Sequence, residues 1–222
     1  MNDLTLLIPA KNEKESLPKV LEEIDNLGLN FKIILKEDDR DTIEAIDKFK
    51  HEILFQPGLG YGDALTYGIN SCKTEYYCIF NADGSFDPKE IKLMHQFLKN
   101  NNLDIVFGSR YEKNSGSDDD TIVTLIGNYI FTFIGKIFFS LPLTDILYTF
   151  VLGKTSISKN LNLKQKDFSF CVELPIKAKK NNLKIKSFPC FERTRLAGEK
   201  KVNAFKDGSL ILFHMIKLFF QK

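Results

Sequence analysis

The chain passes from apolar to acidic within one short stretch, Tyr76-Tyr77-Cys78-Ile79-Phe80-Asn81-Ala82-Asp83-Gly84-Ser85. The apolar part of this stretch has the length and composition of a fully buried strand. In open sheets of parallel strands, ligands bind just beyond the carboxyl ends of the strands. The polar residues that follow Phe80 are therefore the first candidates for a functional site.

The same pattern of apolar and polar segments repeats on both sides of this stretch. Further strands are expected at residues 4–8, 31–35, 53–55 and 104–107, and helices at residues 16–27, 42–49, 63–72 and 88–100. Strands that alternate with helices indicate an α/β fold with a mostly parallel sheet flanked by helices. The polar segments after the strands, at residues 9–13, 37–41, 81–87 and 108–111, are then expected to meet at one edge of the sheet.

Length, charge and cysteine content narrow the class of protein. A chain of 222 residues fits a single α/β domain. Its 31 basic and 29 acidic side chains leave a net charge of +2, so a nucleic-acid partner is not expected. The four cysteines form no CxxC pair, and the start of the chain lacks the basic residues of a signal peptide. These features predict a cytoplasmic protein with reduced thiols.

Asp83 is the residue on which the chemical interpretation depends. A carboxylate at a strand end can hold Mg²⁺ or Mn²⁺, and such an ion neutralises the charge of a departing diphosphate. Asn81 is expected to assist as a second ligand through its side-chain oxygen, and Ser85 could support both. The alternative is an acidic turn that caps the helix expected from Pro88, and Asp87 fits that alternative better than Asp83 does.

Four short motifs occur in the order known from one enzyme family. They are Leu7-Ile8-Pro9-Ala10-Lys11-Asn12-Glu13, Asn81-Ala82-Asp83, Gly108-Ser109-Arg110-Tyr111 and Arg195-Leu196-Ala197-Gly198-Glu199-Lys200-Lys201. In these motifs, which span nearly the whole chain, the sequence resembles glycosyltransferase family 2, whose members have the GT-A fold. Within that family it is similar to the dolichol-phosphate mannosyltransferase-like enzymes, also described as polyprenyl-phosphate sugar synthases.

The resemblance implies an inverting transferase that moves a sugar from a nucleotide-diphosphate sugar to a polyprenyl (dolichyl or undecaprenyl) phosphate. It also implies Mg²⁺ or Mn²⁺ as cofactor, and one GT-A domain in which residues 1–111 bind the nucleotide sugar and residues 112–222 bind the acceptor. The implied nucleotide-sugar contacts are Pro9, Ala10, Glu13, Asp38, Asn81, Ala82 and Asp83, of which Asn81 and Asp83 are also the implied metal ligands. The implied phosphate or acceptor contacts are Arg110, Arg195 and Lys201.

The kind of acceptor decides whether the enzyme needs a general base. A hydroxyl acceptor needs one, whereas a phosphate acceptor is already an anion near neutral pH and mainly needs positioning. Asp145 is the first candidate base, because Thr144-Asp145 matches the T-D segment of the family, and Glu173 is the second. Both side chains could instead be structural acids that accept hydrogen bonds within the fold.

Three positions depart from the pattern of the family. Asn81 stands where the family has Asp, Lys11 where it has Tyr, and Val151 where it has Arg. An amide oxygen is a weaker metal ligand than a carboxylate, and the loss of an arginine removes a cation for an acceptor phosphate. These departures leave open a non-catalytic nucleotide-sugar-binding protein, or a transferase that acts on a saccharide hydroxyl. A sugar-phosphate nucleotidyltransferase is disfavoured, because residues 9–13 lack the glycine-rich basic loop of that class.

Two apolar segments distinguish the second half of the chain. Residues 121–143 nearly reach the length of a membrane span, about 20 residues, but Asn128 and Lys136 interrupt them, which favours a core or interfacial helical pair. Residues 209–220 are expected to form a helix that packs on the sheet or lies on a membrane surface. A peripheral position on the cytoplasmic membrane face, with an integral-membrane partner or as a homo-oligomer, is therefore considered. Residues 114–120 are expected to form a mobile loop, and the glycine-rich residues 58–64 a tight turn near the nucleotide.

Overall fold

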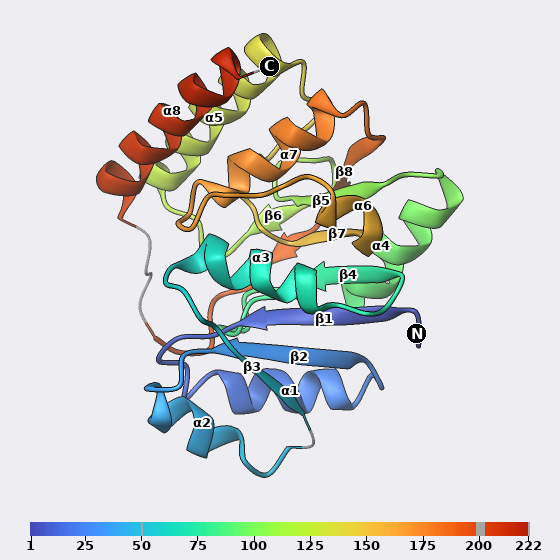
Figure 1. Cartoon of the computed structure of the whole chain (residues 1–222), viewed down its shortest axis with the longest axis vertical. Helices are drawn as coiled ribbons and strands as arrows, with labels where there is room; N and C mark the ends of the chain where they lie inside the picture. The colour runs from blue at the N-terminus through green and yellow to red at the C-terminus, as the bar shows by residue number, and fades with distance from the viewer. Residues whose placement is uncertain (50, 199–202, 222) are drawn as a thin grey trace.

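The main sheet is built around a strand whose side chains are buried on both faces, β1 (Leu4–Pro9). The computed structural model describes residues 1–49, 51–198 and 203–221. The other strands of this sheet are β2 (Asn30–Leu35), β3 (Glu52–Phe55), β4 (Tyr76–Ile79), β5 (Ile105–Ser109), β7 (Val151–Lys154) and β8 (Ile185–Pro189). Their order is β3-β2-β1-β4-β7-β5-β8, and every pairing is parallel except those of β7 (Figure 1). The predicted α/β fold with a mostly parallel sheet is therefore confirmed.

Helices cover both faces of this sheet. They are α1 (Leu17–Asp25), α2 (Arg40–Ile46), α3 (Tyr61–Ser71), α4 (Lys89–Asn100), α5 (Ile122–Phe139), α6 (Thr155–Lys159), α7 (Phe170–Lys180) and α8 (Ala204–Phe220). Two further short strands, β6 (Gly116–Ser117) and β9 (Phe191–Glu192), pair with each other in a second, two-stranded sheet.

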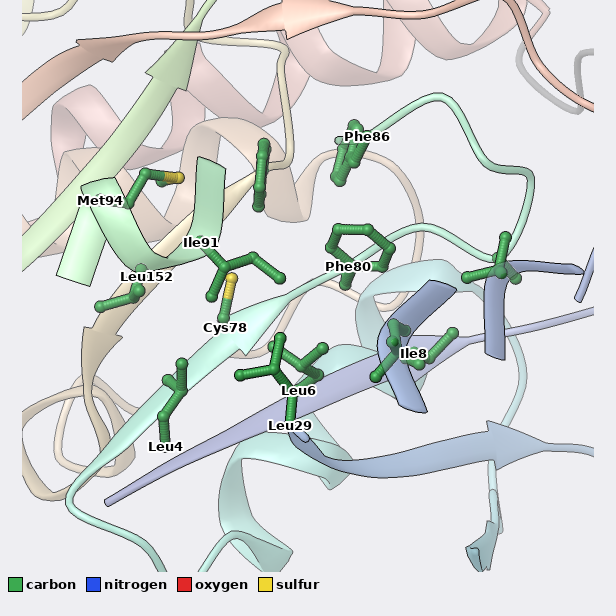
Figure 2. Packing of buried hydrophobic residues seen from close by; sticks show 14 of the residues in the cluster. Leu4, Leu6, Ile8, Leu29, Cys78, Phe80, Phe86, Ile91, Met94 and Leu152 are labelled. Atoms are coloured by element: carbon green, nitrogen blue, oxygen red, sulfur yellow. The ribbon is translucent and has the colours of Figure 1, made fainter. Parts of the chain in front are cut away.

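The alternation of side chains along β1 divides the core into two layers. Successive residues of a strand point to opposite faces, so Leu4, Leu6 and Ile8 enter one cluster and Leu7 enters the other. The first cluster packs β1 and β4 against α1 and α4, and Figure 2 shows Phe80 and Ile91 within it. The second cluster lies under α3 and α7 and takes in buried residues of α5 and α8.

Strand β7 joins the two parts of the sheet. It runs antiparallel between β4 and β5, with Cys78 opposite Leu152 on one side and Val106 opposite Leu152 on the other. A strand from residues 151–154 therefore separates two strands that precede it in the chain. Segments from both halves of the sequence contribute to one continuous sheet.

The elements expected in the first half of the sequence are all present, with ends shifted by a few residues. The second half differs from expectation at two places. Residues 121–143 contain one helix, α5, rather than a pair, and its neighbour is the distant α8. Residues 114–120, expected to be a mobile loop, contain β6, which is held by its pairing with β9.

One helix among the described residues, α5, is long and apolar enough to cross a membrane by length and composition alone. It has 18 residues, a mean hydropathy of 1.7, and only 22% of it is buried inside the structure. Its buried residues include the polar Asn128 and Thr132, whereas most of its isoleucine and phenylalanine side chains are exposed. This distribution is the reverse of what a helix in the core of a soluble protein shows.

Candidate active site

The loops after β1 and β2 are joined at the carboxyl edge of the sheet. The backbone N–H of Asn12 donates to Asp39 Oδ2 at 2.7 Å, and that of Glu13 donates to Thr42 Oγ1 at 3.0 Å. Asp38, the predicted base or ribose contact, is exposed next to this junction. Sequence reasoning singled out residues 37–41 as a segment but did not identify Asp39 as the residue that connects the two loops.

Asp83 is held in a tight turn directly after β4. Its Oδ1 accepts hydrogen bonds from the backbone N–H of Ser85 at 3.0 Å and from Ser85 Oγ at 2.7 Å. Gly84 between them has a φ of +81°, a conformation that glycine adopts at little cost. The turn therefore fixes one carboxylate oxygen, and Oδ2 lies 3.8 Å from the Arg195 guanidinium.

Asn81 is positioned by a tyrosine from the glycine-rich segment. Tyr61 Oη donates to Asn81 Oδ1 at 3.3 Å and lies 2.8 Å from Thr149 Oγ1, while its ring stacks on Phe168 at 5.1 Å. Burial raises the pKa of Tyr61 above its usual range, so its hydroxyl stays protonated and able to donate. The segment expected to be a tight turn near the nucleotide thus contributes a side chain to the site, and neither Tyr61 nor Thr149 was predicted from the sequence.

Residues 193–198 lie over the Asp83 turn. The backbone N–H of Arg193 donates to the Ser85 carbonyl and that of Leu196 to the Asp83 carbonyl, both at 2.8 Å. Arg195 Nη2 also donates to Asp119 Oδ2 at 3.1 Å. Burial alone would lower the pKa of Arg195, but the hydrogen bond to Asp119 and the charge of Asp83 raise it, so the side chain remains a cation. The structure therefore brings the predicted Arg195 to the predicted Asp83, whereas Lys201 lies outside the described residues.

Arg110 and Asp145 form a buried ion pair. Arg110 Nε donates to Asp145 Oδ2 at 2.7 Å, and Nη1 donates to Glu192 Oε2 at 3.2 Å. The carboxylate of Asp145 has no exposed surface and also accepts from Asn128 Nδ2 at 2.7 Å and from the backbone of Tyr148 at 3.2 Å. With both oxygens engaged by the protein, this geometry favours the structural interpretation of Asp145 over the general base.

Glu173 is similarly occupied, on α7. It is 1% exposed and forms an ion pair with Lys177 at 2.7 Å. Its two oxygens also accept hydrogen bonds from the backbone N–H groups of Lys164 and Gln165, at 2.8–3.0 Å. These contacts fasten the loop before α7 and favour the structural role for Glu173 as well.

The described side chains at the site suit a cation that is held jointly with a ligand. Within the described ranges, no group of three or more His, Cys, Asp and Glu side chains could form a ready-made metal cage. Asp83 offers one carboxylate oxygen facing the site, and Asn81 offers an amide oxygen. Mg²⁺ is commonly held by one or two carboxylates together with substrate phosphates and water, so this sparse donor set fits an ion that arrives with a diphosphate.

A family profile and several relatives of known sequence match this chain. The sequence profile described as "Glycosyl transferase family 2" matches residues 5–161. An uncharacterised glycosyltransferase of Mycobacterium bovis is 24% identical over 209 residues, covering 94% of this chain and 93% of that protein. A protein of Methanocaldococcus jannaschii is 25% identical over 229 residues, covering 97% of this chain and 91% of its own length.

Solved structures share the fold. Glucosyl-3-phosphoglycerate synthase from Mycobacterium tuberculosis, in complex with Mn²⁺, uridine diphosphate and glucosyl-3-phosphoglycerate, has a TM-score of 0.71 at 12% identity, covering 97% of this chain and 79% of that one. Mannosyl-3-phosphoglycerate synthase from Rubrobacter xylanophilus has a TM-score of 0.68 at 12% identity, covering 97% and 72%. From the profile match and the geometry at the sheet edge, we conclude that the chain belongs to glycosyltransferase family 2.

Proposed function

We propose that this glycosyltransferase takes its sugar from a nucleotide-diphosphate sugar and transfers it to a polyprenyl phosphate. The observation that carries the donor half of the proposal is the placement of Asp83. Its carboxylate is fixed by the turn at the carboxyl edge of the sheet, below a segment that brings the Arg195 cation to it. An anionic diphosphate needs positive charge at the moment when its bond to the sugar breaks.

Divalent metal is the expected cofactor of the donor site. Asp83 and Asn81 would hold it, and when bound it would polarise the diphosphate as a leaving group. Arg195 would add a planar guanidinium to the phosphate oxygens, and Tyr61 would keep Asn81 oriented toward the site. The Mn²⁺ and uridine diphosphate named in the complex of the mycobacterial synthase support this donor class, although that protein shares only the fold.

The engagement of the two candidate bases supports an acceptor that is already an anion. Asp145 and Glu173 both have their oxygens bonded within the protein, so neither is poised to take a proton from a hydroxyl. A phosphate oxygen attacks without such a base. The large apolar surface of α5 and α8 favours a lipid carrier for that phosphate over a small soluble acid.

A phosphorylated small acid is the second candidate acceptor. The mycobacterial synthase is described in complex with phosphoglyceric acid. Incorporation of labelled sugar into polyprenyl phosphate and into 3-phosphoglycerate, measured side by side, separates the two. Transfer to the small acid alone would overturn the lipid acceptor and leave the donor proposal intact.

The first test concerns the donor. Calorimetry with GDP, UDP, dTDP and CDP sugars, with and without Mn²⁺, is expected to detect metal-dependent binding of one of them. Asp83→Asn keeps the acceptor for Ser85 but removes the charge, so affinity should fall at least about tenfold, as is usual even for supporting residues of metal sites. Asp87→Asn is the matched control, because the Asp87 side chain accepts from the backbone N–H of Lys89 at the helix start, away from Asp83 Oδ2.

The outcomes of this test are distinct. Equal donor affinity of Asp83→Asn and the unchanged protein would contradict the assignment of Asp83. Absence of donor binding by the folded, unchanged protein would favour a non-catalytic relative, for which the replacement of the family's Asp by Asn81 is the specific observation.

A further inference from the structure

Helix α5 carries Asn128 and Thr132 inward and most of its apolar side chains outward. Asn128 donates to Asp145 at 2.7 Å and accepts from the backbone of Leu147 at 3.1 Å, and Thr132 accepts from the backbone of Ile146 at 3.2 Å. The outward face consists of Ile122, Ile126, Tyr129, Ile130, Phe133 and Ile137, each more than half exposed. These polar contacts fix the orientation of α5 on the domain. The exposure of its apolar face is therefore determined by specific hydrogen bonds and is not a result of poor packing.

Helix α8 repeats the same arrangement. It buries only Ile211, Met215 and Leu218. Its outward face consists of Phe205, Leu212, Phe213, Ile216, Phe219 and Phe220, with exposures from 41% to 85%. Residues spaced by three, four and seven positions fall on one side of a helix, so these side chains form a continuous stripe.

The two outward faces form one surface. Figure 1 shows α5 and α8 side by side at the end of the molecule farthest from β3, and α7 packs against both. Phe138 and Phe219 are in edge-to-face contact at 5.7 Å, and Gly208 lies next to Phe131. The helices therefore run in the same direction, with their amino ends together. We call the exposed apolar side chains of both helices the α5–α8 face.

The charged side chains of α5 and α8 that border the α5–α8 face are mostly lysines, whereas the acids Asp118, Asp119 and Asp120 lie just before α5, where Asp119 pairs with Arg195. Lys136, Lys206 and Lys217 are exposed and lie at the borders of the two apolar stripes. Helix α5 contains no acidic residue, and the single acid of α8, Asp207, accepts from the backbone of Asn203 at 2.7 Å. Lysines beside an apolar stripe can extend their stems along it while their ammonium groups reach a layer of anionic headgroups.

The charge pattern favours a lipid bilayer over a second copy of the chain as the partner of the α5–α8 face. A two-fold interface built on this face would place the lysine borders of both copies in one contact, with Asp207 as the one acid of the two helices to oppose them. An anionic lipid surface instead attracts each lysine by about 1 kcal/mol. Burial of the apolar side chains and attraction of the lysines then both favour binding to the bilayer.

We infer that the α5–α8 face docks on an anionic lipid bilayer, with both helix axes lying along its plane. The amino ends of the helices adjoin the candidate active site, since Asp119, three residues before α5, bonds Arg195. Docking would therefore hold the site at the level of the lipid headgroups. The inference depends on residues outside the site, so it stands or fails independently of the proposed donor, whereas the proposed lipid acceptor draws its support from the same face.

Flotation of the full chain with vesicles tests the inference without any turnover. The protein should float with vesicles of phosphatidylcholine and phosphatidylglycerol, and less with phosphatidylcholine alone. Phe133→Glu combined with Phe213→Glu should weaken binding at least about tenfold, because two large apolar contacts are lost. Leu93→Glu is the matched control, since Leu93 is 54% exposed on α4 and lies away from the face.

A second pair of variants tests the charge. Lys136→Glu combined with Lys217→Glu should abolish the preference for anionic vesicles, because each lost lysine weakens binding to them by about fivefold. The circular dichroism melt of the variant should be unchanged. No flotation of the unchanged protein would overturn the inference, as would equal flotation of the phenylalanine variants. A dimer in light scattering that Phe213→Glu dissociates, without vesicle binding, would identify the face as a contact between copies instead.

Discussion

Gly84 is the residue at which the Asp83 turn contacts residues 193–198. A Cβ at this position would lie 2.5 Å from Leu196 Cδ1, and the φ of +81° disfavours any other residue. Gly84→Ala should lower the free energy of unfolding by about 1–3 kcal/mol and weaken donor binding, because residues 193–198 must shift. Urea unfolding and calorimetry measure the two effects.

Gly127→Ala provides the opposite control. Gly127 lies inside α5 with nothing within 4 Å of its would-be Cβ, so alanine should stabilise the protein by up to about 1 kcal/mol. Equal effects of the two substitutions would contradict the role of Gly84.

Asp145 offers a test that distinguishes a structural acid from a base. Asp145→Ala removes the bidentate partner of the buried Arg110 and the acceptor of Asn128, but leaves Arg110 paired with Glu192, so it should cost about 3 kcal/mol of stability, the low end for a broken buried ion pair. Asp145→Asn keeps hydrogen-bond acceptors and should cost less. If the Asn variant folds, its kcat should stay near that of the unchanged protein, whereas a loss of several orders of magnitude would restore Asp145 as the base.

Single residues were predicted where a motif contains them, Asp83 in the segment directly after a strand and Arg195 in a loop that the family resemblance implies. Asp83 and Arg195 were both expected at the site, and the structure brings them within 3.8 Å of each other. Tyr61, Thr149 and Asp39 were not predicted, because their roles depend on contacts between segments that no local pattern links. The hydrogen bond between Tyr61 and Thr149, for example, joins positions 88 residues apart.

At the scale of elements, Asp104 connects three strands of the sheet through its side chain and backbone. Its Oδ1 accepts from Lys154 Nζ, and its Oδ2 accepts from the backbone of Lys184, both at 2.9 Å. Burial opposes ionisation, but these two hydrogen bonds outweigh it and lower the pKa of Asp104 below its ordinary value of 3.8. Its contribution to stability is therefore present above that value and is lost as the pH falls through the lowered pKa.

Asp104→Asn should reveal this contribution. The variant should be less stable than the unchanged protein at pH 7, and the difference should shrink as the pH is lowered below about 4. Urea unfolding across this range measures it. A difference that stays constant with pH would mean that the charge of Asp104 contributes nothing.

The helices and strands of the first half could be predicted from the local pattern of apolar and polar residues. Those of the second half could be predicted from it only in part. Strands 4–8 and 76–80 are apolar runs that end at polar turns, so their boundaries can be read directly. Strands β6 and β9 have two residues each, too short for any periodicity. Helix α5 is apolar enough to suggest burial, and only the placement of Asn128 and Thr132 in the structure reveals which side faces inward.

At the scale of the whole molecule, the candidate site and the α5–α8 face have different physical characters. The site is a set of short polar loops held by hydrogen bonds at a sheet edge, whereas the face is a pair of apolar helices bordered by lysines. Substitutions on one are expected to leave the other intact. This separation is what allows donor binding and vesicle flotation to be measured as independent properties.

The insertion of β7 between β4 and β5 also constrains how the chain assembles during its synthesis. After β5 leaves the ribosome, neither of its edges has a neighbour until residues 151–154 (β7) have been made. Its second partner, β8, emerges still later. Pairings between distant segments form slowly, and an unpaired apolar strand is prone to aggregate. While the apolar α5 is translated, β5 therefore remains unpaired in the nascent chain. Apolar surface is then most exposed, so we expect chaperone binding to reduce aggregation most during this interval.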